Sequence, residues 1–118
     1  MQYMLLIYGD EKQWTKLPQP ELDKVYGQYM KYSQALVDAG VMRGGSELKP
    51  TSSATTVRVR NGKVTTVDGP FAETKEQLGG YYILEVPNLE KALEWAGKCP
   101  GAQSSAVEVR PLPDRAPK

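Results

Sequence analysis

Residues 64–86 read VTTVDGPFAETKEQLGGYYILEV and contain two β-rich runs. The first run ends at Asp68 and the second is YYILEV at 81–86, so that residues 68–80 form a connection with turn residues at both ends. Directly upstream, TTVRVR is separated from KVTTV by Asn61-Gly62, a pair that favours a two-residue hairpin turn. Consecutive strands joined in this way predict an antiparallel sheet.

Two amphipathic helices accompany these strands. The first is predicted over residues 20–39, because Pro20 suits a first helical turn and Gly40 suits the residue after a helix end. The second is predicted over residues 88–98, with Asn88 as its N-cap. The apolar stripes are Leu22, Val25, Tyr26, Tyr29, Met30, Ser33, Leu36 and Val37 in the first helix, and Leu89, Ala92, Leu93 and Ala96 in the second.

The remaining strands complete a ferredoxin-like plan. YMLLIY (3–8) reads as the first strand, residues 41–48 as a broken strand, and AVEVR (106–110) as the last. The order predicts a single α+β domain over residues 1–118, in which two helices cover one face of an antiparallel sheet and a hairpin is inserted in the middle. Residues 9–19 read as a loop, and PLPDRAPK at the end reads as a loose tail.

The first strand is apolar on both faces, although two helices can cover only one face of a sheet. Leu5 points one way and Leu6 the other, and in YYILEV the same holds for Leu84 and Ile83. Leaving such side chains in water forgoes about 1.5–3 kcal/mol each. We therefore expect a homodimer that covers the open face, the alternative being half-exposed tyrosines and an unusually apolar edge strand.

Composition excludes several classes of chemistry. The chain has 118 residues and a net charge of +1, from 15 basic and 14 acidic side chains, so nucleic acid is not an expected partner. Histidine is absent, which excludes His-ligated zinc and His-dependent triads, and we expect neither a metal nor a cofactor. Cys99 is the only cysteine, and no long apolar run or leader is evident. A cytoplasmic protein without membrane contact is expected.

The stretch from Asp68 to Glu76, followed by Gly79-Gly80-Tyr81-Tyr82, resembles the signature of the YCII-related (DGPF-motif) family. The resemblance extends to Gly40 with Gly44-Gly45, to LEKALEWAGKCP (89–100) and to AVEVRPL (106–112). It implies a dimeric α/β barrel with a cleft at the DGPF loop. The shorter YCII branch has a His–Asp pair suggested to be catalytic, and that role has no counterpart in a chain without histidine.

The motif supplies candidate catalytic and ligand-binding residues, each with a structural alternative. Asp68 could act as a general base or anchor a polar ligand, or could simply hold backbone N–H groups of the turn. Glu73 could act with Lys75 as an acid–base pair, or the two could form a solvated turn with offsetting charges. Phe71 is expected to plug the loop onto the core rather than to stack on a substrate.

Residues on the strands complete the expected ligand set. Arg110 could bind a carboxylate or phosphate through its guanidinium fork, or pair with Glu85 or Glu108; for Arg58 and Arg60 an ion pair is favoured. Tyr81 and Tyr82 must point to opposite faces, so one belongs to the core and the other could line the cleft. The expected ligand-binding residues are Asp68, Phe71, Glu73, Tyr81 and Arg110.

Two functions of different classes remain open on these residues. The first is a module that binds a small polar or aromatic metabolite in a barrel cleft or serves a regulatory partner. The second is a cofactor-free lyase or isomerase that uses Asp68 or Glu73 as base and an arginine as oxyanion partner. A buried carboxylate with a raised pKa would favour the enzyme, and an exposed DGPF loop would favour the binding module.

Overall fold

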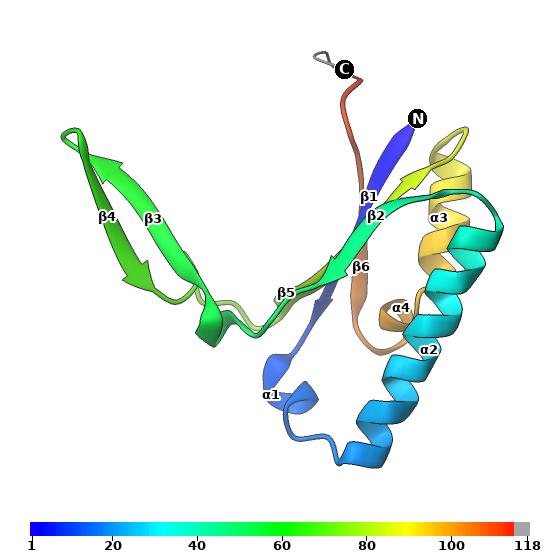
Figure 1. Cartoon of the computed structure of the whole chain (residues 1–118), viewed down its shortest axis with the longest axis horizontal. Helices are drawn as coiled ribbons and strands as arrows, with labels where there is room; N and C mark the ends of the chain where they lie inside the picture. Colours follow the sequence, from blue (N-terminus) through cyan, green and yellow to red (C-terminus); the bar gives the residue numbers. More distant parts are fainter. Residues whose placement is uncertain (115–118) are drawn as a thin grey trace.

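A computed structural model of the chain describes residues 1–114 and has an α+β fold (Figure 1). The helices and strands are β1 (Gln2–Gly9), α1 (Glu11–Trp14), α2 (Gln19–Asp38), β2 (Met42–Glu47), the 3₁₀ turn η1 (Thr51–Ser53), β3 (Thr55–Arg60), β4 (Lys63–Asp68), β5 (Gln77–Glu85), α3 (Leu89–Lys98), α4 (Pro100–Ser104) and β6 (Ala106–Pro111).

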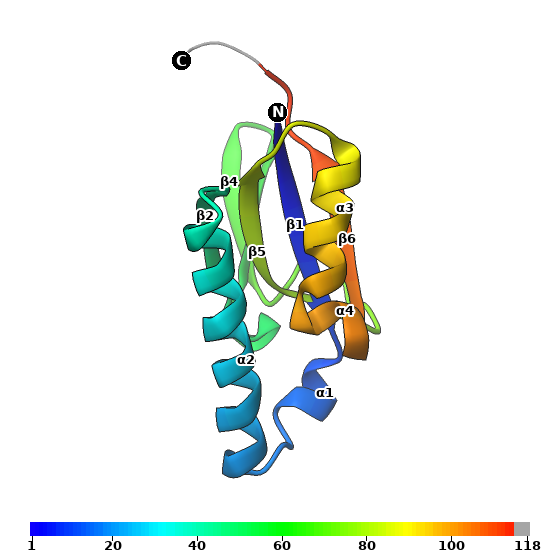
Figure 2. The ribbon, with the colours of Figure 1, turned by 90° about the vertical axis from the view of Figure 1, so that its right-hand side faces the viewer.

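The main sheet has four strands in the order β2-β5-β1-β6, and every neighbouring pair is antiparallel. Helices α2 and α3 lie on the same face of this sheet (Figure 2). The predicted ferredoxin-like arrangement is therefore confirmed. In the register of β1 and β5, Leu5 faces Tyr82, and both point toward the helices and are buried. Leu6 faces Tyr81 on the opposite side, which the helices leave open.

The signals for the helix ends act as expected. Helix α2 has a proline in its first turn, and the chain leaves it through Gly40, whose φ of 73° suits a residue without a side chain. At the start of α3, the Asn88 side chain accepts a hydrogen bond from the Lys91 N–H at 3.0 Å. This bond satisfies one of the free N–H groups of the first helical turn.

The inner faces of both helices differ from the predicted stripes. Met30 and Val37 are 73% and 56% exposed, whereas Tyr32, outside the predicted stripe, is buried. Its ring packs edge-to-face on Tyr82, and its hydroxyl donates to the Trp95 carbonyl oxygen at 2.7 Å. A tyrosine can be buried at this position because its polar end has a partner. In α3, likewise, Ala92 and Ala96 are buried while Leu89 and Leu93 are about half exposed.

Several segment boundaries also differ from the prediction. Residues 9–19 contain the short helix α1, which Asp10 caps by accepting from the Lys12 N–H, and α4 follows directly after α3. Strand β5 begins at Gln77, so the connection after β4 is shorter than predicted. The tail is tied to β1 at Leu112, whose N–H donates to the Gln2 carbonyl; the end of the predicted tail, 115–118, lies outside the described residues.

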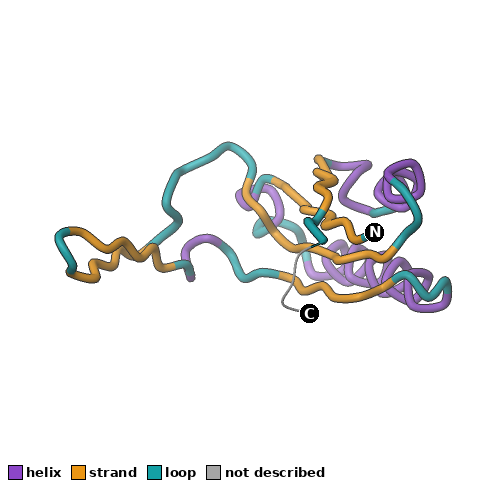
Figure 3. The backbone as a smooth tube through the Cα atoms, turned by 90° about the horizontal axis from the view of Figure 1, so that it is seen from above, coloured by secondary structure: helices purple, strands orange, loops and turns teal. Residues whose placement is uncertain are grey.

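The β3–β4 hairpin forms a separate two-stranded sheet that projects away from the body of the molecule (Figures 1 and 3). Its turn is the predicted Asn61-Gly62, with φ of 52° and 75°. Both central residues have positive φ, as a type I′ hairpin turn requires. We call residues 55–68 the arm. Within residues 1–114, no helix is long and apolar enough to span a bilayer.

Candidate functional site

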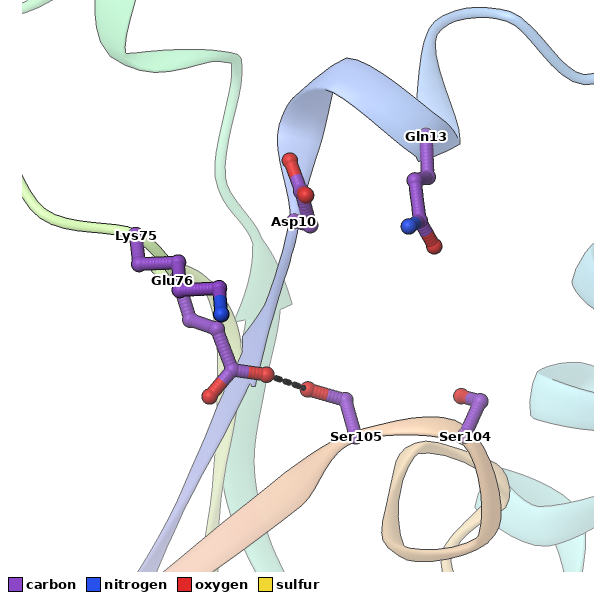
Figure 4. A pocket seen from close by; sticks show the side chains of 6 residues that line it. All are labelled: Asp10, Gln13, Lys75, Glu76, Ser104 and Ser105. Atoms are coloured by element: carbon purple, nitrogen blue, oxygen red, sulfur yellow. Dashed lines mark hydrogen bonds between the residues drawn. The ribbon is translucent and has the colours of Figure 1, made fainter.

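A cavity of about 370 Å³ lies at the end of the main sheet where β1 ends and β5 and β6 begin (Figure 4). Its position follows from the topology, because three neighbouring strands bring their connecting segments to this edge. The DGPF connection contributes its last two residues before β5. The lining residues are Asp10, Gln13, Lys75, Glu76, Ser104 and Ser105.

Hydrogen bonds hold two walls of the cavity together. The Ser105 hydroxyl donates to a Glu76 carboxylate oxygen at 2.7 Å, which joins the segment before β6 to the DGPF connection (Figure 4). The Gln77 side-chain oxygen accepts from the Glu11 N–H at 2.9 Å, so the same connection is also fixed to α1. The cavity edge is therefore built from three segments that contact one another.

The lining is polar and carries charges of both signs. Lys75 is absent from the three ion pairs found among residues 1–114, and its ammonium group lies on the same side of the cavity as Glu76 (Figure 4). Asp10 and two serine hydroxyls add acceptors and donors. Within residues 1–114, no three His, Cys, Asp or Glu side chains gather as metal ligands.

A polar group lies on the open face of the sheet. The Tyr8 hydroxyl donates to one carboxylate oxygen of Glu108 at 3.2 Å, and the Arg110 guanidinium donates to the other, its Nε at 3.0 Å. The hydrogen bond from Arg110 is the main reason that the pKa of the Glu108 carboxyl lies below its ordinary value. Burial is the main reason that the pKa of the Tyr8 phenol is raised, and the neighbouring Glu108 raises it further. At neutral pH the group thus contains a carboxylate, a guanidinium and a neutral phenol.

Apolar side chains surround this group. On the open face Leu6 lies opposite Tyr81, and Met4 lies opposite Ile83, all of them half-buried. Arg110 lies opposite Met4 on the other neighbouring strand. The open face therefore presents an apolar patch beside a polar group in which the charges of the carboxylate and the guanidinium cancel.

Residues 1–114 match the family model of the YCII-related domain. The chain belongs to the YCII-related family. One relative, an uncharacterized protein of Rhizobium meliloti (strain 1021), is 37% identical over 114 residues, which cover 95% of this chain and 92% of the relative. The family resemblance drawn from the DGPF stretch is thereby confirmed.

In this YCII-related chain the expected ligand residues fall into two groups. Tyr81 and Arg110 lie on the open face of the sheet. Asp68, at the end of β4 opposite Thr55, is exposed, as is Glu73 in the following connection. Both lie outside the cavity lining, which the DGPF connection borders through Lys75 and Glu76 instead.

Phe71 was expected to plug the loop onto the core, and this prediction is wrong. The side chain is 80% exposed. The physical reason is the path of the chain, because Phe71 follows the base of the arm before the connection reaches the main sheet. Phe71 is therefore not part of the hydrophobic core.

The ion-pair alternatives also have clear outcomes. Arg110 pairs with Glu108, one of its two expected partners, along the same strand rather than across strands. Arg58 and Arg60 are exposed on the arm, and neither belongs to the ion pairs found among residues 1–114. Glu76 bonds to Ser105, a partner that the local sequence gives no means to foresee.

The sequence reasoning missed Asp10, Gln13, Ser104 and Ser105 as lining residues. Asp10 and Gln13 lie in the segment predicted as a loop, and Ser104 and Ser105 lie between the predicted second helix and the last predicted strand. Their one usable signal is position, since they lie in the segments that follow β1 and precede β6, whose ends meet at the same edge of the sheet.

The prediction that Tyr81 and Tyr82 point to opposite faces is confirmed. Tyr82 is buried in the core while Tyr81 lies on the open face. Cys99 is fully buried, and burial raises the pKa of its thiol, so the thiol is neutral and shielded at physiological pH. Cys99 is therefore part of the core and takes no part in the candidate site.

Proposed function

We propose that this YCII-related chain is a homodimeric binding module that holds a small polar metabolite at the end of its sheet. The observation that carries the proposal is the cavity into which Lys75, Glu76 and the two serines converge. Polar side chains that converge from separate segments, two of them tied together by the Ser105–Glu76 bond, can fix the orientation of a polar ligand.

The lining favours a particular class of ligand. Lys75 can bind a carboxylate or phosphate, while Asp10, Glu76 and the serines can accept from hydroxyl or ammonium groups. A molecule that carries both kinds of group, such as a hydroxy acid or an amino acid, would satisfy both sets of side chains. The mixed charges make a purely anionic or purely apolar ligand a poorer match.

The placement of the candidate bases favours binding over catalysis. Asp68 and Glu73, the bases of the lyase or isomerase hypothesis, are both exposed to solvent. Catalytic carboxylates usually act in sheltered sites that raise their pKa. Glu108, the open-face carboxylate, has its pKa lowered by Arg110, which makes it a weaker base.

The open face of the sheet supports the homodimer. Leu6 and Ile83 are half-buried on this face, which Figure 1 shows without a covering helix, and each would gain part of the about 1.5–3 kcal/mol that burial from full exposure provides. A second copy offers an identical apolar patch, which is the arrangement of an isologous interface. Light scattering at micromolar concentration should therefore give about twice the 13.1 kDa of one chain.

Isothermal titration with L-malate and L-serine tests the ligand proposal, preceded by native mass spectrometry of the purified protein for a retained adduct. We expect one of the two probes to bind, and Lys75→Met to weaken its binding about tenfold or more, since the carboxylate loses a charged donor. Lys24→Met, at an exposed position on α2, is the matched control and should bind normally.

Asp68→Asn separates the module from the enzyme. On the proposal, this variant binds the probe as tightly as the unaltered chain, because Asp68 lies outside the cavity lining. If Asp68→Asn abolished binding or an observed turnover while Lys75→Met had no effect, the cavity would be the wrong site and a catalytic DGPF loop would be the better account.

A further inference from the structure

The two faces of the arm differ in composition near the turn, where one carries valines and the other carries basic side chains. Cross-strand partners share a face, so Val57 lies beside Val59 and Val64, with Val64 directly opposite Val59. These three valines are 58%, 65% and 68% exposed, and we call them the valine face. The other face is basic near the turn, where it carries Arg58, Arg60 and Lys63, and at the base of the arm it carries one exposed valine, Val67.

The arm does not pack on its own molecule. Strands β3 and β4 contact each other far more than they contact any other element. An isolated two-stranded hairpin is marginally stable in water, and it needs a further surface to hold its shape. Three exposed valines on one side are the surface that such a partner would cover.

The dimensions of the chain point the same way. The radius of gyration is 16.3 Å, where a compact domain of this length has about 13.5 Å. The chain exposes 8578 Å², where a compact monomer of this mass exposes about 6,400 Å². The excess is of the order of 2,000 Å², which exceeds the roughly 800 Å² that each partner buries in a standard protein interface. A second copy of the chain could take up an area of this size.

The base of the arm is held in place. Glu11 of α1 accepts from the Thr51 N–H at 2.8 Å and from the Thr51 hydroxyl at 2.9 Å, immediately before β3. Across the base, the Gly69 N–H donates to the Ala54 carbonyl at 2.7 Å, and the Thr56 hydroxyl donates to the Gly69 carbonyl at 2.8 Å. These bonds orient the arm before any partner arrives, which lowers the entropic cost of contact.

The direction of the arm identifies what it meets. In Figure 1 the arm and the main sheet diverge from a common base like the limbs of a V, and α2 and α3 lie on the far side of the sheet. The open face of the sheet therefore looks toward the arm. A second copy that covers the open face would lie between the main sheet and the arm, where it also contacts the arm.

We propose that the arm clasps a second copy of this chain, with the valine face against that copy and Phe71 at the rim of the contact. The inference rests on the homodimer of the proposed function and extends it, because it assigns the dimer a second contact surface outside the main sheet. It also gives the exposed Phe71 a role, since contact with a second copy at the base of the arm would shield its ring from water.

The test is a pair of double variants on alternating residues of β3. Val57→Thr/Val59→Thr removes apolar surface from the valine face, and Arg58→Thr/Arg60→Thr changes the other face of the same strand. Threonine keeps the strand propensity in both. Sedimentation equilibrium should show the dimer weakened about tenfold or more by the valine pair and less than about threefold by the arginine pair. Far-UV circular dichroism checks that both variants fold.

Hydrogen exchange provides a second measurement. In the unaltered chain, amides of residues 55–68 should exchange more slowly at concentrations where the dimer forms than at concentrations where it dissociates. A dimer that tolerates the valine variant and leaves the arm amides unprotected would overturn the clasp while leaving the homodimer standing. An unaltered chain that remains monomeric in every measurement would overturn both the clasp and the homodimer, whatever the outcome of the ligand titration.

Discussion

Raising the pH should destabilise the folded protein, because several ionisable groups are buried in its core. Tyr29, Tyr32 and Tyr82 lie near the fully buried Cys99 in the layer between α2 and the sheet. Burial raises the pKa of the Cys99 thiol above its ordinary value of 9.0. Burial likewise raises the pKa of the three phenols above 10.0, for Tyr29 and Tyr32 far above it. All four groups are neutral when protonated, so the folded chain keeps protons that the unfolded chain loses.

The sign and size of the effect follow from proton linkage. Above the ordinary pKa of each group, the unfolded state binds fewer protons than the folded state, so the free energy of unfolding falls as pH rises. Each retained proton costs about 1.4 kcal/mol per pH unit. Cys99 begins to contribute above about pH 9, and above about pH 10 Tyr29 and Tyr32 together raise the slope by up to roughly 3 kcal/mol per unit, with Tyr82 acting in the same direction. Because the free energy of unfolding of a domain is about 5–15 kcal/mol, a small further rise in pH removes a large part of it.

Urea unfolding followed by far-UV circular dichroism, at intervals from about pH 8 to 11, measures this slope directly. Cys99→Ala should flatten the curve below about pH 10 and leave the steeper fall above it, because the phenols remain. A free energy of unfolding that stays constant from about pH 8 to 11 would refute the reasoning, since the buried groups would then titrate equally in both states.

Three further substitutions, one of them with a control, test the core, a close backbone contact and a helix cap. Leu5→Ala should lower the free energy of unfolding by about 2–5 kcal/mol in urea titration, because Leu5 is fully buried. Gly45→Ala should cost about 1–3 kcal/mol, since its Cβ would lie 2.8 Å from the Tyr81 carbonyl oxygen. Its control is Gly27→Ala within α2, where nothing lies within 4 Å of the added methyl group and a gain of up to about 1 kcal/mol is expected. Asn88→Ala should lower the thermal midpoint by removing the cap of α3, a loss of about 1 kcal/mol.

The fold was largely predictable because its signals are local. Asn61-Gly62 determines a hairpin through the backbone dihedrals of two residues, and Asn88 begins a helix through one hydrogen bond. Alternation along β1 and β5 showed that both faces of the sheet are apolar. Each of these inferences depends on neighbours in the sequence and not on tertiary contacts.

What could not be predicted depends on distant contacts. Tyr32 is buried because the Trp95 carbonyl, 63 residues away, accepts its hydroxyl hydrogen bond. The cavity exists because Ser105 reaches Glu76 across the end of the sheet. Phe71 is exposed because the hairpin departs from the main sheet, and strand propensity carries no information about which sheet a hairpin joins.

The DGPF motif connects two parts of the molecule, the arm and the cavity. Its first half, Asp68 to Phe71, lies at the base of the arm, and its last residues, Lys75 and Glu76, line the cavity. Only residues 69–76 separate the arm from β5, so both halves are held by the same short connection. A stretch that combines turn residues, an aromatic ring and charges therefore needs no single catalytic purpose. Its turn aims the arm, its ring and valine neighbours suit contact with a second copy, and its charges suit a polar ligand.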